Sequence, residues 1–153
     1  HFPGKLELYL ALLDTHAEAL VERVRGAMGA TADNAERVHN AISAYFDFMD
    51  GGGTDLEGAY RLVFDSDLRN EPVVRDRVAR ASRRCMEAIA DTIAADTGLP
   101  RPQAELLSVA LIGLSEIGAR WWLDSNYAVP KADAIRLLET LAWRGISSFP
   151  RQS

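Results

Sequence analysis

Apolar residues recur at steps of three and four along most of this chain, which is the period of amphipathic α-helices. The first stripe follows the turn pair Pro3-Gly4 and predicts a helix from Lys5 to Gly29; it consists of Leu6, Leu10, Leu13, Ala17, Leu20, Val24 and Met28. Stripes of the same period predict five more helices, over residues 33–50, 54–68, 71–97, 102–126 and 131–149. The pattern therefore predicts an all-α fold of six helices.

Local signals mark where several of these helices begin and end. Asp33 and Glu36 have the spacing of an N-terminal capping box, and Asn70 is placed to cap the fourth helix. Three consecutive glycines end the second helix. The segment from Gly98 to Pro100 ends the fourth, because glycine accepts the left-handed conformation and proline cannot continue a helix.

The composition is that of a globular protein and narrows the classes of function. The 153 residues include 17 Lys and Arg against 22 Asp and Glu, a net charge of −5, so the chain is not expected to hold nucleic acid by phosphate neutralisation alone. No apolar run approaches the length of about 18 residues that suggests a membrane span. The single cysteine, Cys85, fits a reducing compartment. We expect a cytoplasmic protein that does not associate with membranes.

Few residues suggest catalysis or metal binding. His1, His16 and His39 are dispersed, and neither a glycine-rich phosphate loop nor a Cys or His pair with metal-ligand spacing is present. Cys85 lies on an apolar helix face, as a buried structural thiol would. We therefore expect a protein that is not an enzyme and that holds no metal ion or cofactor.

The two ends of the chain resemble the regulatory part of TetR-family transcription factors. Residues 1–5, His-Phe-Pro-Gly-Lys, resemble the family's junction between recognition helix and ligand domain, and residues 122–149 resemble its C-terminus. The resemblance implies that residues 1–4 are the remnant of a helix-turn-helix DNA-binding domain and that residues 5–153 form a six-helix ligand-binding and dimerisation domain. It also implies that His1 and Lys5 lie near the phosphates of operator DNA, although an exposed lysine at a helix start is the simpler alternative.

Four shorter segments, KLELYLALLDTH, AYFDFMD, YRLVFDSDLRNEPVV and RWWLDSN, are similar to the FasR-like group of actinobacterial regulators. That group activates genes of fatty-acid synthesis and responds to long-chain acyl-CoA. The resemblance implies a DNA-binding transcriptional regulator whose effector is a long-chain fatty acyl-CoA. A TetR-type repressor that senses another hydrophobic ligand and a stand-alone lipid-binding module are the alternatives.

An acyl chain would need a long apolar tunnel, which we predict between the first and second helices. Each buried CH2 group contributes about 0.8 kcal/mol, so a dry tunnel suits an alkyl chain. The candidate ligand-binding residues are Leu13, His16, Leu20, Val24, Met28, Ile42, Tyr45, Phe46, Met49, Phe64, Cys85, Ile89 and Leu114. Apolar stripes of helical period usually form packed core, and that alternative stays open for each of them.

Three arginines on the fourth helix are candidates for binding the phosphates of an acyl-CoA. Arg77, Arg80 and Arg84 are at positions i, i+3 and i+7, so they share one helix face, and arginine binds phosphate bidentately. The alternative is a solvated face paired with Asp76 and Glu87.

The last two helices are predicted to form a homodimer. Trp121 and Trp122 are adjacent, so both cannot face the core of one protomer. The resemblance implies a two-fold four-helix interface. The candidate interface residues are Ile112, Ala119, Trp122, Leu138, Leu141, Ala142 and Ile146.

Overall fold

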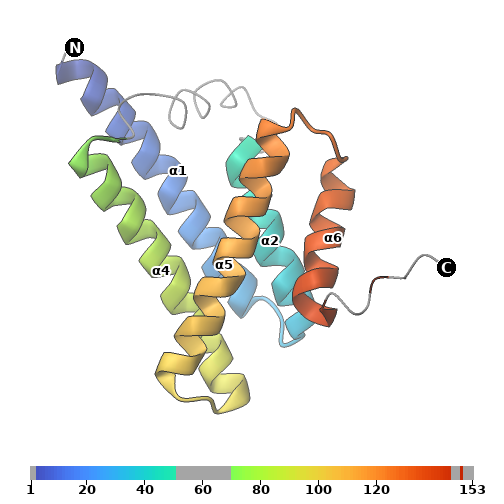
Figure 1. The fold of residues 1–153 in the computed structure, drawn as a ribbon. Helices are drawn as coiled ribbons and strands as arrows, with labels where there is room; N and C mark the ends of the chain where they lie inside the picture. Colours follow the sequence, from blue (N-terminus) through green and yellow to red (C-terminus); the bar gives the residue numbers. More distant parts are fainter. Residues whose placement is uncertain (1–2, 51–69, 146–148, 150–153) are drawn as a thin grey trace.

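The computed structural model describes residues 3–50, 70–145 and 149, and these fold into α-helices (Figure 1). The helices are α1 (Pro3–Gly29), α2 (Asn34–Asp50), α4 (Pro72–Thr97), α5 (Arg101–Asp124) and α6 (Lys131–Arg144). Within the described ranges there is no strand, and the all-α prediction is confirmed. The helix predicted over residues 54–68 lies outside the described residues.

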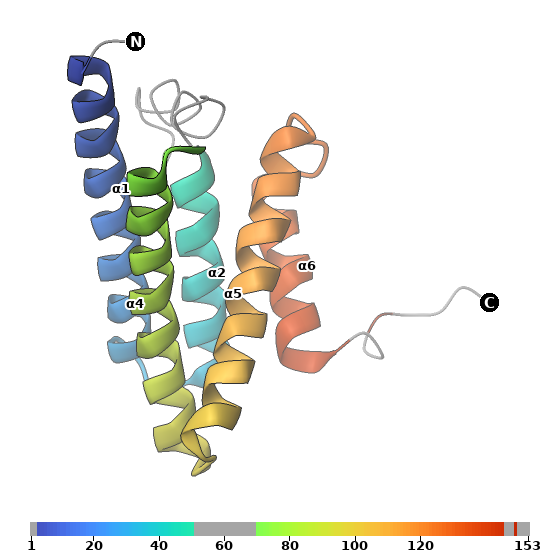
Figure 2. The same ribbon diagram turned by 60° about the vertical axis from the view of Figure 1, so that its left-hand side comes forward.

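The helices pack side by side in a closed ring, and one further helix–helix contact crosses the ring. α1 packs against α2 and α4, α4 packs against α5, and α6 packs against both α5 and α2. α2 also meets α5 directly. Figures 1 and 2 show the helices running roughly along one axis, with α1 and α4 side by side and α6 beyond α5. The space between α2 and α5 is therefore the centre of the bundle.

The N-terminal ends of α1 and α4 differ from the prediction. Pro3 and Gly4, predicted as a turn, form the first turn of α1 instead. A proline is tolerated there because the first amides of a helix have no intrahelical acceptor. The N-cap of α4 is Glu71, followed by Pro72, rather than Asn70.

Glycines end two of the helices. Gly98 ends α4 with a φ of 71°, as predicted, and its N–H donates to the carbonyl of Ala94. Gly145, with a φ of 84°, ends α6 at Arg144 rather than near residue 149. Both conformations are ones that glycine adopts without steric cost.

An aromatic cluster fixes α2 against α5. The rings of Phe46 and Trp122 lie 5.2 Å apart, and Tyr127 packs edge-on against Trp122 at 4.9 Å. The Trp122 indole N–H donates to the carbonyl oxygen of Val129 at 2.6 Å. Trp122 is therefore a core residue of its own protomer, with its one polar atom satisfied.

Asp47 ties three helices together at the same end of α2. Its carboxylate accepts from Arg23 of α1 at 2.6 Å and from Lys131 of α6 at 2.6 Å, and Lys131 also pairs with Asp50 at 2.7 Å. Burial raises the pKa of the Asp47 carboxyl, but the hydrogen bonds from Lys131 and Arg23 outweigh it and leave the pKa below its usual range. The carboxylate is therefore held in its charged form, which these contacts require.

α5 is apolar on two faces. By length and composition alone it could cross a membrane, yet one face packs against α2, α4 and α6. On that face the hydroxyls of Ser108 and Ser115 are buried and donate to the carbonyls of Met86 and Leu111. The other face exposes a stripe at steps of three and four that consists of Leu106, Val109, Gly113, Ile117 and Trp121. A contact inside one protomer does not account for this stripe.

Replacing Phe46 by alanine should destabilise the protein by about 3–5 kcal/mol, because its side chain is 0% exposed and fills the α2–α5 contact. The matched control is Leu8→Ala in α1, where the side chain is 63% exposed and the expected change is within about 0.5 kcal/mol. Urea unfolding followed by circular dichroism measures both. Equal effects of the two substitutions would show that Phe46 is not a core anchor.

Candidate functional site: an apolar cavity with one charged rim

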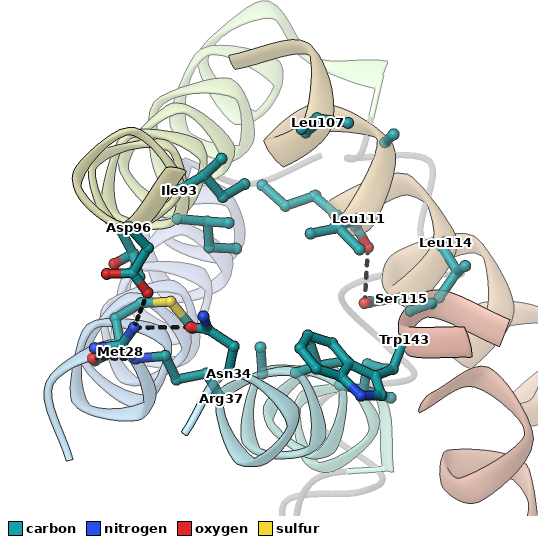
Figure 3. A pocket seen from close by; sticks show the side chains of 18 of the residues that line it. Met28, Asn34, Arg37, Ile93, Asp96, Leu107, Leu111, Leu114, Ser115 and Trp143 are labelled. Carbon is teal, nitrogen blue, oxygen red and sulfur yellow. Dashed lines mark hydrogen bonds and ion pairs between the residues drawn. The ribbon is translucent and has the colours of Figure 1, made fainter. Parts of the chain in front are cut away.

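A cavity of about 410 Å³ lies in the half of the bundle where α2 begins and α4 ends. Figure 3 shows its open centre surrounded by Ile93 of α4, Leu107, Leu111 and Leu114 of α5, and Trp143 of α6. α2 supplies the remaining wall with one helix face, and α1 contributes Met28 alone. At roughly 30 Å³ for a water-sized group, this volume holds on the order of a dozen methylene-sized groups.

Small side chains stand among the walls of this half of the α2–α5 contact. Ala41 of α2 and Ala110 of α5 line it, whereas the other half of the same contact is filled by Phe46 and Trp122. Helix axes are held about 8–10 Å apart by the largest side chains between them, so the alanine half cannot close. The aromatic cluster therefore keeps the cavity open.

The serine and threonine hydroxyls in the cavity wall donate to backbone carbonyls. Thr92 donates to the carbonyl of Ala88 at 3.1 Å, and Thr97 donates to that of Ile93 at 2.6 Å. Ser115 likewise donates to the carbonyl of its own helix four residues earlier. These hydrogens are not available to a ligand, so most of the wall is chemically apolar.

Charge is concentrated at one rim of the cavity. Arg37, in the first turn of α2, donates from Nη1 to Asp96 of α4 at 2.7 Å and to Asn34 at 2.9 Å. Its Nε donates to the carbonyl oxygen of Met28 at 3.0 Å. The Arg37 side chain is 16% exposed. Three helices, α1, α2 and α4, are thus joined by one guanidinium at the rim, as the dashed bonds in Figure 3 show.

Five of the residues predicted to bind ligand line this cavity: Met28, Ile42, Tyr45, Ile89 and Leu114. Leu107 and Leu111 of α5, also suggested by the sequence, line it as well. The walls that were not predicted from the sequence are Asn34, Arg37, Val38, Ala41, Thr92, Ile93, Asp96, Thr97, Ala110, Ile112, Ser115, Ala142 and Trp143. The tunnel was predicted between the first two helices, whereas this cavity is walled mainly by α2, α4 and α5, with Met28 as its one wall residue from α1.

The other predicted ligand residues lie in packed clusters. Leu20, Val24 and Cys85 belong to the core between α1, α2 and α4, and Leu13 packs with Tyr9 and Val74. Phe46 and Met49 pack around Trp122. His16 is half-buried on α1, and burial lowers its pKa. Phe64 lies outside the described residues.

A second and much smaller void, of about 30 Å³, lies beside α1. Leu13, Leu20 and Tyr45 are among its walls, and Tyr45 is also a wall of the large cavity. The void has room for no more than about one water-sized group. Tyr45 is therefore the partition between the two spaces.

The three arginines predicted to bind phosphate line a surface groove, away from the cavity. Arg77 pairs with Asp14 of α1, and Arg84 makes a two-point contact with Glu18 at 2.6 and 3.1 Å. The hydrogen bond from Arg84 lowers the pKa of Glu18. Arg80 lies between these pairs in the groove. The groove and the cavity share no wall residue among those described, and the paired carboxylates are on α1 rather than at Asp76 and Glu87.

The predicted dimer residues mostly face their own protomer. Ile112, Ala119 and Trp122 are buried, and Ala142 lines the cavity. Leu138 packs so closely on α5 that a Cβ added at Gly118 would meet it at 2.7 Å. Leu141 is half-buried, and Ile146 lies outside the described residues. Ile112, Ala119 and Trp122 are thus core residues of their own protomer, whereas the apolar stripe that points outward on α5 runs from Leu106 to Trp121. An interface through the last two helices stays a prediction.

Lys5, the residue expected near DNA phosphates, is exposed in the first turns of α1, while His1 lies outside the described residues. Among the described residues, no group of three or more His, Cys, Asp or Glu side chains is arranged to hold a metal ion.

Burial of Cys85 gives a direct test of the cavity's boundary. Burial raises the pKa of the Cys85 thiol, and its neighbour Tyr45, whose pKa burial also raises, hydrogen-bonds to it. Both groups are held neutral, so the contribution of Cys85 to stability is lost as the pH rises above about 8.5, and that of Tyr45 as it rises above about 10. At pH 8 a thiol reagent should label the native protein at least a hundred-fold more slowly than the urea-unfolded protein, since the closed thiol reacts only through rare opening.

Cys85 is the single cysteine, so the absorbance of released thionitrobenzoate reports this residue alone. Rapid stoichiometric labelling of the native protein would show that the space reaches Cys85 and that the walls given above are incomplete.

Comparisons with known proteins place the chain in a family. A search of protein-family models finds no match. A curated protein, the HTH-type transcriptional activator FasR of Mycolicibacterium smegmatis, is 39% identical over 150 residues, which span 98% of this chain and 67% of FasR. The chain belongs to the FasR family of HTH-type transcriptional regulators.

Proposed function

We propose that this chain is the effector-binding and dimerisation region of a cytoplasmic TetR-type regulator that senses a long-chain fatty acyl-CoA. Residues 5–153 bind the effector in the cavity, and operator DNA is bound by a helix-turn-helix joined to the N-terminus of α1. Lys5, exposed near that end, contacts a DNA phosphate.

The cavity is the main structural support for this proposal. A space of about 410 Å³ is within the usual range for small-molecule sites, and its wall offers apolar side chains with few free polar hydrogens. Burying an alkyl chain of a dozen carbons there contributes on the order of 10 kcal/mol before the costs of ordering. A polar group buried against the apolar walls, away from the charged rim, would be left without hydrogen-bond partners.

The chain belongs to a family of transcriptional regulators, and this supports the regulator over a stand-alone lipid-binding module. A lipid carrier would not need a helix joined to a DNA-binding domain. A repressor that senses another hydrophobic ligand would use the same cavity. The charged rim beside an apolar wall favours an alkyl chain with an anionic head over a ligand that is apolar throughout.

The outward stripe of α5 is the proposed dimer interface. Its apolar residues are between 55% and 70% exposed, which is unusual for a row of large side chains on one helix face. Leu137 of α6, 49% exposed, extends the same kind of surface. Gly113 has open space beyond it and allows a partner helix to approach closely. Pairing α5 and α6 of two protomers would bury this surface in a four-helix contact.

Filling the cavity should abolish ligand binding without unfolding the protein. Leu111→Trp adds a ring into the open centre seen in Figure 3, so hexadecanoyl-CoA at about 100 times its dissociation constant should raise the melting temperature of the parent by about 5–10 °C and leave that of the variant unchanged. Leu8→Trp, on exposed α1, is the control and should respond as the parent does.

A full response of the Leu111→Trp variant would rule out this cavity as the site. The absence of any response in the parent, with hexadecanoyl-CoA and with hexadecanoate, would count against the proposed effector class.

A charge in the outward stripe should separate the protomers. Ile117→Glu places a carboxylate at the centre of the proposed interface, where an unpaired charge costs several kcal/mol, while Ala11→Glu on the exposed face of α1 should have no effect. Sedimentation velocity should give a dimer for the parent and the control and a monomer for Ile117→Glu. A dimer for all three places the interface elsewhere.

A further inference from the structure

Arg37 lies at the rim of the cavity and retains hydrogens for a ligand. A guanidinium has five N–H donors. Three of them are engaged within the described residues, from Nε to Met28 and from Nη1 to Asn34 and Asp96. The two hydrogens on Nη2 are the remaining donors, and they belong to a side chain that lines the cavity. The serine and threonine hydroxyls of the wall have their hydrogens on backbone carbonyls instead, and Tyr45 hydrogen-bonds to Cys85.

The surroundings of Arg37 favour an anion at this point. Arg37 lies in the first turn of α2, where the aligned peptide dipoles give a positive potential. Among the described wall residues it is the single cation. Asp96 is the single carboxylate, and it stands in the last turn of α4, where the helix dipole is unfavourable to a negative charge. Arg37 is what holds that carboxylate in place.

We propose that Arg37 is the head-group site of the cavity: it binds the anionic oxygen of an amphipathic ligand, a carboxylate or a phosphate, whose alkyl chain lies along the wall between α4 and α5. This proposal rests on the proposed function and adds to it which end of the ligand lies at the rim of the cavity. Asp96 is the internal competitor, since its carboxylate accepts a hydrogen bond from the same guanidinium and repels a second anion.

The proposal predicts opposite effects for the two partners of one ion pair. Arg37→Gln removes the anion's partner, and the affinity for hexadecanoate or hexadecanoyl-CoA should fall about ten-fold or more, as for the loss of one charge-assisted hydrogen bond. Asp96→Asn breaks the same ion pair but removes the competitor, so the affinity should be equal to that of the parent or higher. Both variants should bind hexadecanol as the parent does.

Isothermal titration calorimetry of the parent, Arg37→Gln, Asp96→Asn and Arg80→Gln with the three ligands tests this. Loss with hexadecanoate identifies a carboxylate as the bound group, and loss with hexadecanoyl-CoA alone identifies a phosphate; either supports the site. Arg80→Gln changes the surface groove and should leave all three affinities unaltered.

Two results would overturn the inference while leaving the cavity as the effector site. One is parallel weakening in Arg37→Gln and Asp96→Asn, which is the signature of a purely structural ion pair. The other is loss of binding in Arg80→Gln with none in Arg37→Gln, which would place the head group in the groove. If the parent binds none of the three ligands, the proposed function falls as well.

Discussion

The side chains that pack between α2 and α5 determine how far apart these two helices lie. These two helices face each other across a ring closed by α1, α4 and α6, so their separation sets the width of the whole bundle. At one end Phe46 and Trp122 fill the space, and Asp47 fixes α1 and α6 to the same end through Arg23 and Lys131. At the other end alanine and leucine side chains cannot reach across the distance that the aromatic rings impose. The packed end thus holds open the hollow one, in which we propose that the effector binds.

This arrangement suggests how filling the cavity reaches a DNA-binding domain. α1 runs for 27 residues, roughly 40 Å, and only its last turn meets the cavity, through Met28. The carbonyl of Met28 is bonded to Arg37, the same group that we propose for the ligand head. A shift of Arg37 towards an anion would loosen this bond and change the tilt of α1, whose far end moves most. Coupling of this kind amounts to about 1–3 kcal/mol in known cases, and a single charge-assisted bond is enough to supply it.

The helices could be read from the sequence, but the faces they bury could not. The period of apolar residues and the stop at Gly98 placed α2, α4 and α5 to within a few residues, because these signals are local. The stripe of α1 is buried at Leu13, Leu20 and Val24 as its period predicts, yet the same pattern does not say whether a stripe meets packed core or empty space. α5 is apolar all round, so the sequence could not tell its inner face at Trp122 from its outer face at Trp121. Arg37 carried no signal at all, since its partner Asp96 is 59 residues away and the polar rim arises from the way α2 and α4 meet.

We propose that the alkyl chain of the effector lies between α2, α4 and α5. Photocrosslinking with a hexadecanoyl-CoA analogue that carries a diazirine at the middle of its chain tests it most directly, because the label marks the residues that surround the chain. We expect the label on α4 and α5, at Ile89, Ile93 or Leu111, and an excess of hexadecanoyl-CoA should prevent this labelling. Label on α1 at Leu13 or Leu20, or in the groove beside Arg80, would contradict it.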